Sequence, residues 1–347
     1  MHIFDYSFLK KTVPTEIVST AMVVADLRAR EEIRKTTGMS TLSALRERAI
    51  IESVRDSNAL EGIVTTEERL RDIVSGDKPV TRSEQEISGY RDALNLIHTE
   101  HERLDLSDEL IKSLHSMITS ETAPARAGIY KTADNQIIEI DENGKWRIRF
   151  SPVPAYETEE AMEQLLLAYF DARQDEGIPA LLLIPCVVLD FLCIHPFFDG
   201  NGRISRLMTL LLMYNSGYDI GRFISVERMI SEYKEAYYST LAESSKGWHE
   251  NKSDYIPFVI FFLQILYRCY KELDECFMDE SLTGSKKNER IEAVLMNSIV
   301  PISKADVLEK LPDVSVRTVE AVLRKLQQEK KIKKIGANKN ARYIKAE

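Results

Sequence analysis

The chain has 347 residues, a formal net charge of −9 and 44% hydrophobic residues, which predicts a globular protein with room for two or three domains. The charge is uneven, since residues 286–347 carry a net charge of +7 and residues 1–285 a net charge of −16. The longest apolar run, 255–267, is too short to span a bilayer, and no signal peptide is evident. These features argue against a membrane or secreted protein and predict a cytoplasmic one.

Apolar residues at helical spacing predict an all-α fold for most of the chain. Helices are expected at 15–36, 42–60, 66–75, 83–101, 107–120, 157–174, 178–194, 203–216, 227–244 and 254–277. Ser107 and Thr158 stand before acidic first turns, as N-cap residues do. Four cysteines lie in apolar helical stretches without a C-x-x-C spacing, so we expect reduced, buried thiols at Cys186, Cys193, Cys269 and Cys276.

Residues 136–140 and 145–150 break the helical pattern. Both are short β-prone runs, and the Asn-Gly pair in 141–144 supplies a tight turn between them. The second run alternates large apolar residues with basic ones. A lone hairpin on a helical protein is expected, and it either decorates the surface or offers its free edge to a strand of another protein.

The loop between the helices at 178–194 and 203–216 has the composition of a nucleotide-phosphate site. A helix N-terminus near Gly202 favours anions, and glycine lets the backbone approach phosphate oxygens closely. The loop also contains a neutral base near pH 7, a hard carboxylate ligand for Mg²⁺ and two arginines on one helix face. These residues are His195, Asp199, Gly200, Asn201, Gly202, Arg203 and Arg206. The alternative is an ordinary interhelical loop with surface arginines.

The basic C-terminal region follows a polar stretch at 281–288. Short helices are expected at 289–298, 303–311 and 315–328, and strands at 331–335 and 342–345. This pattern resembles a winged helix-turn-helix, whose recognition helix would begin at Ser315 and carry Arg317, Arg324 and Lys325. Its expected partner is DNA or a protein, including a second copy in a homodimer; a solvated basic tail is the remaining alternative.

The stretch 195–206 resembles the signature of the Fic family, H-x-F-x-[D/E]-G-N-G-R-x-x-R, at all eight specified positions. The resemblance implies a helical Fic bundle with a hairpin flap, and an enzyme that transfers AMP from ATP to a protein hydroxyl. His195 would be the general base, Asp199 would hold Mg²⁺, and Phe197 would anchor the loop. The α- and β-phosphates would bind Gly200, Asn201, Gly202 and Arg203, and the γ-phosphate would bind Arg206.

Residues 57–62 resemble the family's inhibitory pattern, [S/T]-x-x-x-E-[G/N], through Ser57, Glu61 and Gly62. Their place before the core resembles the subclass whose inhibitory helix belongs to the same chain. Glu61 would form a bidentate pair with Arg206 and keep it from the γ-phosphate. Taken alone, the pattern is an ordinary helix end with Gly62 as its cap. Some relatives use this glutamate to remove AMP, so a bifunctional enzyme is an alternative.

Other segments resemble the family's surroundings of the site. Residues 128–131 resemble the flank of the flap, and His115 on the preceding helix is expected to be a core or supporting histidine rather than a catalyst. Residues 233–241 resemble the helix that lines the base pocket, with Tyr238 as an ATP contact and Ser245 one turn beyond. Core packing is the alternative for Tyr237 and Tyr238.

We therefore expect an N-terminal helical region with the inhibitory helix (1–105), a catalytic core (106–277), a linker (278–288) and a winged helix-turn-helix (289–347). The expected function is Mg²⁺-dependent protein adenylylation from ATP, inhibited by Glu61, on a target protein that docks on the 136–150 hairpin and that includes the chain itself. The competing hypothesis is a transcriptional regulator that uses the core as a nucleotide sensor.

Overall fold

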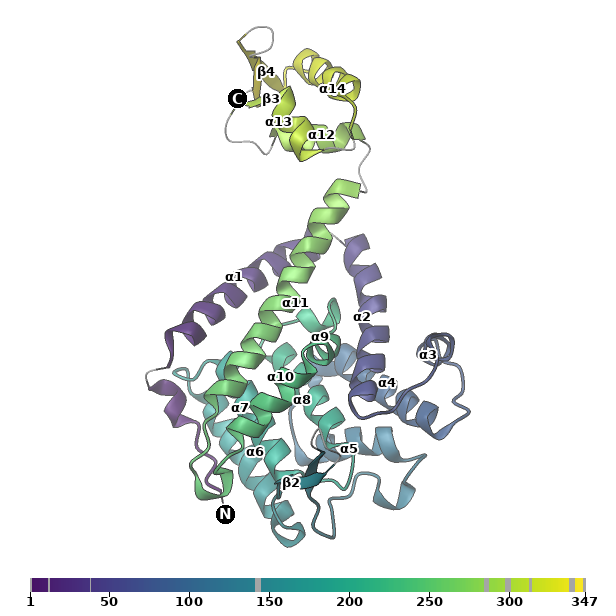
Figure 1. The fold of residues 1–347 in the computed structure, drawn as a ribbon, viewed down its shortest axis with the longest axis vertical. Helices are drawn as coiled ribbons and strands as arrows, with labels where there is room; N and C mark the ends of the chain where they lie inside the picture. The colour runs from purple at the N-terminus through teal and green to yellow at the C-terminus, as the bar shows by residue number, and fades with distance from the viewer. Residues whose placement is uncertain are drawn as a thin grey trace. The chain divides into compact units, whose positions relative to one another are not determined.

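Figure 1 shows the protein as a computed structural model, which describes residues 2–11, 13–37, 39–140, 145–283, 287–296, 301–311, 314–336 and 341–345. Contacts along the chain divide it into two compact units, Met1–Leu273 and Asp274–Glu347. No helix within the described ranges is both long and apolar enough to cross a membrane.

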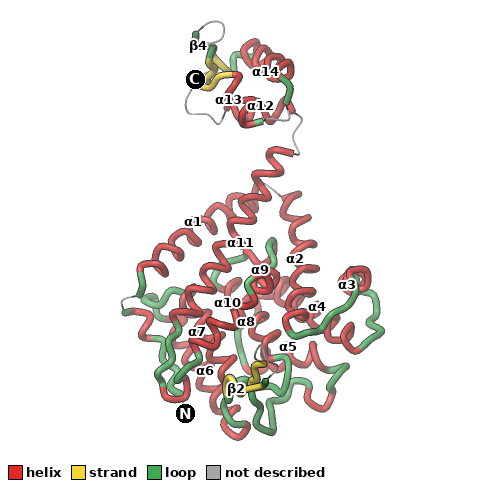
Figure 2. Tube along the Cα trace, in the orientation of Figure 1, coloured by secondary structure: helices red, strands yellow, loops and turns green. Residues whose placement is uncertain are grey.

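The first unit is helical, with one small hairpin (Figure 2). Its helices are α1 Thr15–Thr37, α2 Met39–Leu60, α3 Glu67–Val74, α4 Arg82–Glu100, α5 Asp108–Thr119, α6 Thr158–Gln174, α7 Ala180–Ile194, α8 Asn201–Asn215, α9 Val226–Glu232, α10 Lys234–Ser244 and the larger part of α11 Ile256–Thr283, which continues past the boundary at Leu273. Most of these match the predicted helices within a few residues. The mostly helical fold that the sequence predicts is confirmed.

The helix predicted at 227–244 is wrong, because the chain leaves the helical backbone at Tyr233 (φ −109°, ψ 32°) and forms α9 and α10. Packing explains the break. α9 lies against α2, whereas α10 places Tyr237 against the rings of Phe258 and Phe261 on α11. Glycine and proline are absent from the break, so the sequence carried no signal for it.

Helices α7 and α8 form the centre of the first unit. α7 is apolar on every side and packs between α6 and α8. Every residue of α8 from Arg203 to Tyr214 is buried, including both arginines. The loop that joins these two helices is therefore held at both ends by fully packed elements.

A buried carboxylate fastens α7 to distant parts of the chain. Asp190 accepts hydrogen bonds from the hydroxyls of Tyr6 (2.8 Å) and Tyr255 (2.7 Å) and from the indole nitrogen of Trp248 (2.7 Å). Burial raises the pKa of Asp190 to about 6, although these three donors oppose the shift. The N-terminal segment and the start of α11 are thus fixed to the helix that leads into the loop.

The hairpin pairs β1 (Ile137–Ile140) with β2 (Trp146–Phe150) in antiparallel register, with Ile138 opposite Ile148. The small hairpin that the sequence predicts is confirmed, while its turn at 141–144 lies outside the described residues. Trp146 and Ile138 are 66% and 62% exposed. An apolar face on this hairpin therefore lies open to solvent.

The second unit contains the helices α12 Lys287–Met296, α13 Lys304–Lys310 and α14 Val316–Gln328, and the strands β3 Ile302–Ser303, β4 Ile332–Ile335 and β5 Arg342–Lys345. The strands form an antiparallel sheet in the order β3-β5-β4. Its core is built from side chains of all these elements, among them Ile291, Val307, Leu323, Ile332 and Tyr343. The helices and the last two strands match the predicted ones within two residues, whereas the two-residue β3 is too short to be seen in a sequence pattern.

Two expectations need correction. The linker expected at 278–288 is partly helical, because α11 continues to Thr283 and α12 begins at Lys287. No helix-breaking residue stands before Gly284, so the helix has no reason to end earlier. Of the four cysteines, Cys276 is only half buried, while Cys186, Cys193 and Cys269 are buried as expected.

Candidate active site

The loop between α7 and α8 is fixed by two backbone turns and one amide. His195 ends α7 in the left-handed region (φ 51°), and Gly200 precedes α8 at φ 80°. The Asn201 side chain accepts a hydrogen bond from the N–H of Phe197 (2.9 Å) and donates one to its carbonyl (2.8 Å). Because both ends of this amide are used, it closes the loop around the fully buried Phe197 ring.

His115 supports this loop from α5. Its ring stacks on Phe197 at 3.8 Å, its Nδ1 accepts from the N–H of Gly128 (3.0 Å), and its Nε2–H donates to the carbonyl of Asp199 (3.2 Å). Burial lowers the pKa of His115 to about 4. The neutral ring is thus saturated with partners, which agrees with the supporting role predicted for it.

His195 is the titratable base of the loop. Its Nδ1–H donates to the carbonyl of Leu192 (3.3 Å), so the lone pair of the neutral ring is on Nε2. Burial lowers the pKa of His195 to about 4, helped by the nearby charges of Lys131 and Arg149 and opposed by Glu61. The imidazole is therefore neutral and able to accept a proton at pH 7.

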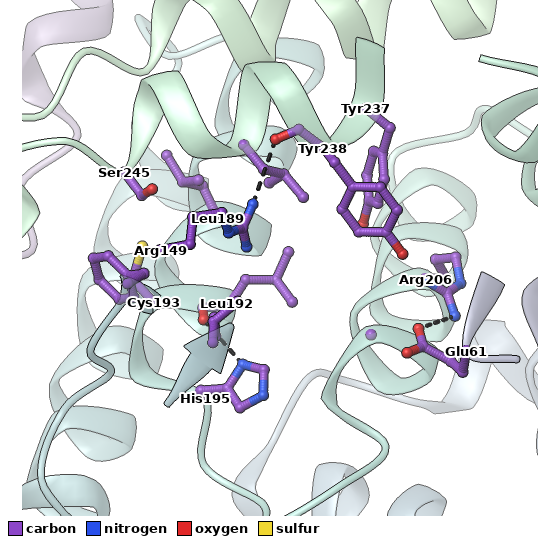
Figure 3. Close-up of a pocket in the computed structure, with 14 residues that line it drawn as sticks. Glu61, Arg149, Leu189, Leu192, Cys193, His195, Arg206, Tyr237, Tyr238 and Ser245 are labelled. Carbon is purple, nitrogen blue, oxygen red and sulfur yellow. Dashed lines mark hydrogen bonds and ion pairs between the residues drawn. The ribbon is translucent and has the colours of Figure 1, made fainter. Parts of the chain in front are cut away.

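A cavity of about 170 Å³ joins this histidine to the other predicted site elements. Figure 3 shows side chains converging on it from α2, the hairpin, α7, α8 and α10. They are Glu61, Ile137, Arg149, Phe150, Leu189, Leu192, Cys193, His195, Gly202, Arg206, Tyr237, Tyr238, Leu241 and Ser245. The structure thus brings together Glu61, the signature loop and the 233–245 segment, which the sequence had connected only by resemblance.

Arg149 is a cavity residue that sequence reasoning missed. The alternation in 145–150 marks it as polar, but it does not say which face of the hairpin lies against the protein. In the structure its guanidinium donates to the carbonyl of Tyr238 (3.4 Å) within the cavity (Figure 3). Arg147 instead pairs with Glu139 on the hairpin surface (3.0 Å). The cavity therefore contains a second cation besides Arg206.

Arg206 is bound to the end of α2 by three hydrogen bonds. Its Nη2 donates to Glu61 Oε1 (2.8 Å) and to the carbonyl of Ser57 (2.8 Å), and its Nε donates to Ser57 Oγ (2.8 Å). The expected bidentate pair is thus replaced by one carboxylate contact and two serine contacts. Burial works against the charge of Arg206, but Glu61, Tyr237 and Tyr90 together outweigh it, so the pKa of the guanidinium is raised.

Glu61 lies at the first turn of α8 because of how α2 ends. Gly62 adopts φ 76°, and the N–H groups of Gly62 and Ile63 bond back to the carbonyls of Ala59 and Asn58 (both 3.0 Å). This glycine cap leaves Glu61 as the last residue before the chain turns away. A methyl group on Gly202 would overlap the Glu61 carboxylate. The carboxylate therefore occupies the N-terminus of α8, where an anion is favoured.

Arg203 points into the protein and not into the cavity. Its side chain is 0% exposed and donates from Nη1 to Glu86 Oε2 on α4 at 2.7 Å. Its Nε and Nη2 are buried without a partner within the described ranges. Together with the closed amide of Asn201, this leaves the main-chain N–H groups of the first turn of α8 as the donors that face an anion.

Asp199 is the exposed carboxylate of the loop, and its Oδ1 accepts from the N–H of Gly200 (2.6 Å). Among the described residues no group of three or more His, Cys, Asp or Glu side chains is placed to hold a metal ion. A single carboxylate suits Mg²⁺, which is usually held by one or two carboxylates together with phosphate oxygens and water. The donor set fits a metal that arrives with a nucleotide.

Comparison with known proteins agrees with this geometry. Residues 105–213 match the Fic/DOC family, so the chain contains a Fic/DOC domain. It is 29% identical over 146 residues to the protein adenylyltransferase fic-1 of Caenorhabditis briggsae and 28% identical over 145 residues to that of Caenorhabditis elegans. Each match covers 40% of this chain and only 25% of the relative.

Solved structures share the fold. A Fic family protein from Desulfovibrio desulfuricans G20 has a TM-score of 0.64 at 21% identity and covers 96% of this chain and 97% of its own. A Fic domain containing signaling protein from Bacteroides thetaiotaomicron has a TM-score of 0.59 at 20% identity, covering 75% of this chain and 96% of its own. A fragment of Fic-1 from C. elegans has a TM-score of 0.58 at 22% identity, covering 76% and 73%.

Proposed function

We propose that this chain is a protein adenylyltransferase, which transfers AMP from ATP to a hydroxyl group of a target protein, and that Glu61 inhibits it. One observation carries the proposal. One cavity is lined by the neutral His195 with its free Nε2, by the N-terminus of α8 and by the buried Arg206. The carboxylate of Glu61 lies against both the helix N-terminus and Arg206. The similarity to fic-1 adenylyltransferases supports the same reaction.

The proposed chemistry is an in-line displacement at the α-phosphorus. Nε2 of His195 takes the proton of the target hydroxyl, whose oxygen bonds to the α-phosphorus. The bond from this phosphorus to the oxygen of the β-phosphate breaks, and pyrophosphate leaves. His195 is suited to this role because burial keeps it neutral and Leu192 fixes its tautomer.

The phosphates are assigned to the N-terminus of α8. Main-chain N–H groups of Asn201, Gly202 and Arg203 would donate to the α- and β-phosphates, after Gly200 has turned the chain into the helix. The side chains of Asn201 and Arg203 would act indirectly, by holding the loop and the helix. Asp199 would hold a Mg²⁺ ion, which supplies positive charge against the pyrophosphate leaving group.

Inhibition is assigned to the last residues of α2. Glu61 places a negative charge at the helix N-terminus and takes one donor of Arg206, so it opposes binding of the γ-phosphate in the productive position. Ser57 contributes by holding the guanidinium beside Glu61. Removing the carboxylate leaves Arg206 in place with a donor free for the γ-phosphate.

The adenine of ATP and the target protein are assigned to opposite sides of His195. Tyr238, Leu241 and the apolar side chains of α7 would enclose the adenine, with Ser245 at the far end of the pocket. The target would add a strand to the hairpin, whose exposed Trp146 and Ile138 offer apolar contacts beside the cavity.

The test uses ATP labelled at either the α- or the γ-phosphate, incubated with wild type and with Glu61→Gly in the presence of cell lysate. AMP transfer puts the α-label and not the γ-label on protein, and Glu61→Gly should show it more strongly. Transfer of the γ-label would indicate a kinase. Tight ATP binding without any protein label would favour the competing nucleotide-sensing regulator. Loss of label from modified target in wild type, but not in Glu61→Gly, would reveal a second, AMP-removing activity.

We propose that the second unit is a winged helix-turn-helix that docks on a DNA or protein partner. Support comes from its helix order, its small sheet, and the exposed Arg317 and Arg324 on α14. DNA binding should weaken steeply with added salt and fall in Arg317→Ala and Arg324→Ala, whereas Lys304→Ala, whose lysine already pairs with Glu320, should change it little. Retention of a protein from lysate at salt that releases DNA would identify the partner as a protein.

A further inference from the structure

Lys131 lies under the loop that bears His195 and is almost fully buried. It is the last residue of the segment 128–131, which lies well before the signature stretch 195–206 in the sequence. Its side chain donates to the carbonyl of Ile194 (3.0 Å) and to the side-chain oxygen of Asn135 (2.9 Å). Its main-chain N–H donates to the carbonyl of Pro196 (2.8 Å). Lys131 therefore holds the residues immediately before and after His195.

Asn135 extends this contact to the next residue of the loop. Its side-chain nitrogen donates to the carbonyl of Phe197 (3.0 Å), which also accepts from Asn201. Lys131 and Asn135 thus bind three carbonyls around His195, which are those of Ile194, Pro196 and Phe197. Such fixation matters here, because His195 has a left-handed backbone that a residue with a β-carbon does not adopt readily.

The ammonium group is also one of the charges that act on the imidazole. The charged groups around His195 are Lys131 from the segment before the hairpin, Arg149 from β2 and Glu61 from the end of α2. The two cations disfavour protonation of His195, and Glu61 favours it. Of these three charged groups, the Glu61→Gly variant keeps the two cations.

We propose that Lys131 is a positioning residue for His195, which fixes the backbone on both sides of the base and holds it in the neutral form with Nε2 free. The inference rests on the proposed function only for the role of His195 as a base. The orientation and the protonation of the His195 imidazole can be observed even in a protein that transfers no AMP. Lys131 acts through His195 and touches no reacting atom.

The first test is the imidazole itself, observed by ¹⁵N NMR of the full-length, histidine-labelled protein. Wild type should show the Nδ1–H tautomer of His195 at pH 7, and protonation only well below pH 6. In Lys131→Met the second tautomer should appear and protonation should begin at a higher pH. Lys131→Arg keeps a charge and donors and should restore both. An unchanged tautomer and an unchanged onset in folded Lys131→Met would overturn the proposal.

The second test is kinetic, in the Glu61→Gly background. Lys131→Met should lower kcat for AMP transfer by about 10- to 100-fold, as small misplacement of a catalytic group does, with KM for ATP nearly unchanged. Lys112→Met removes a nearby lysine that lies over the Tyr130 ring and contacts none of residues 194–197, so kcat should stay as in the parent. A raised KM with normal kcat would make Lys131 a nucleotide ligand and refute the positioning role.

Two variants keep these tests decisive. If Lys131→Met does not fold, Lys131→Gln retains a donor for Ile194 and removes only the charge, so the onset of His195 protonation should still rise. If no protein transfers AMP, the proposed function fails, but the NMR arm still decides whether Lys131 orients His195.

Discussion

Arg203 and Glu86 form an ion pair 2.7 Å long inside the protein, between α8 and α4. The arginine that a nucleotide-site pattern would assign to phosphate therefore contributes to packing of the catalytic helix. Breaking such a buried pair leaves an uncompensated charge, so Glu86→Ala should destabilise the fold by about 3–5 kcal/mol. Glu86→Gln, which retains an acceptor, should cost less. Thermal unfolding measures the loss, and a large drop in ATP affinity without loss of stability would contradict it.

Glu61→Gly should raise AMP incorporation strongly, whereas Arg206→Ala should not. Both changes break the Glu61–Arg206 contact, but only the first leaves a guanidinium for the γ-phosphate. The lost charge-assisted bond is worth about 1.5–3 kcal/mol. The double variant should therefore resemble Arg206→Ala in a labelled-ATP assay. A double variant as active as Glu61→Gly would refute the assignment of Arg206.

His195→Ala should abolish transfer while ATP still binds. Loss of a general base typically costs about 10²- to 10⁴-fold in rate, and the imidazole is not needed for the phosphate contacts of α8. Calorimetry with ATP and a labelling assay, both in the Glu61→Gly background, separate the two effects. His249→Ala, which removes an exposed histidine bonded to the carbonyl of Ser151, serves as control and should stay active.

The rate should depend on pH in a way that reflects a buried base. The active form of His195 is neutral, and burial lowers its pKa to about 4. The kcat/KM of Glu61→Gly should therefore stay flat from about pH 5 to 8 and fall only near pH 4 and below, as His195 takes a proton. A midpoint near 6.5 would show that His195 is solvated.

Asp199→Ala should lose transfer, and excess Mg²⁺ should restore little of it. Asp199 is the exposed carboxylate of the loop, and its remaining oxygen is the donor assigned to the metal. Asp171→Ala, which removes an exposed carboxylate on α6, should behave as the parent does. The chelator EDTA should silence both parent and control. Robust transfer without metal would disprove the assignment.

The sequence predicted the helices well because their apolar spacing is strong, and it predicted the elements of the cavity through pattern resemblance. It did not show the break at Tyr233, which packing imposes without any breaking residue. Neither did it show that Arg203 turns inward, because a pairing partner such as Glu86 is one carboxylate among 55 acidic residues with nothing local to mark it.

The geometry of the contact between Arg206 and the end of α2 was also beyond the sequence. A serine and a glutamate four apart at a helix end predict that both reach one neighbour, but not which atoms bond. In the structure the guanidinium of Arg206 donates two hydrogen bonds to Ser57 and one to Glu61. Lys131 was noted only as part of a segment that resembles the family's flank, because two of its three partners are main-chain carbonyls, which residue types do not reveal.

The sharing of Arg206 between Ser57 and Glu61 has a consequence for the time scale of the inhibition that we propose. Two of the three bonds that join Arg206 to α2 come from Ser57, and they remain when Glu61 leaves. Release therefore requires rotation of one side chain, 28% exposed, and no departure of the helix. Rotamer changes of exposed side chains take picoseconds to nanoseconds, far less than a catalytic turnover. We therefore expect Glu61 to exchange rapidly between two rotamers, and under the proposed inhibition the basal activity would measure the fraction of time that its side chain spends turned away.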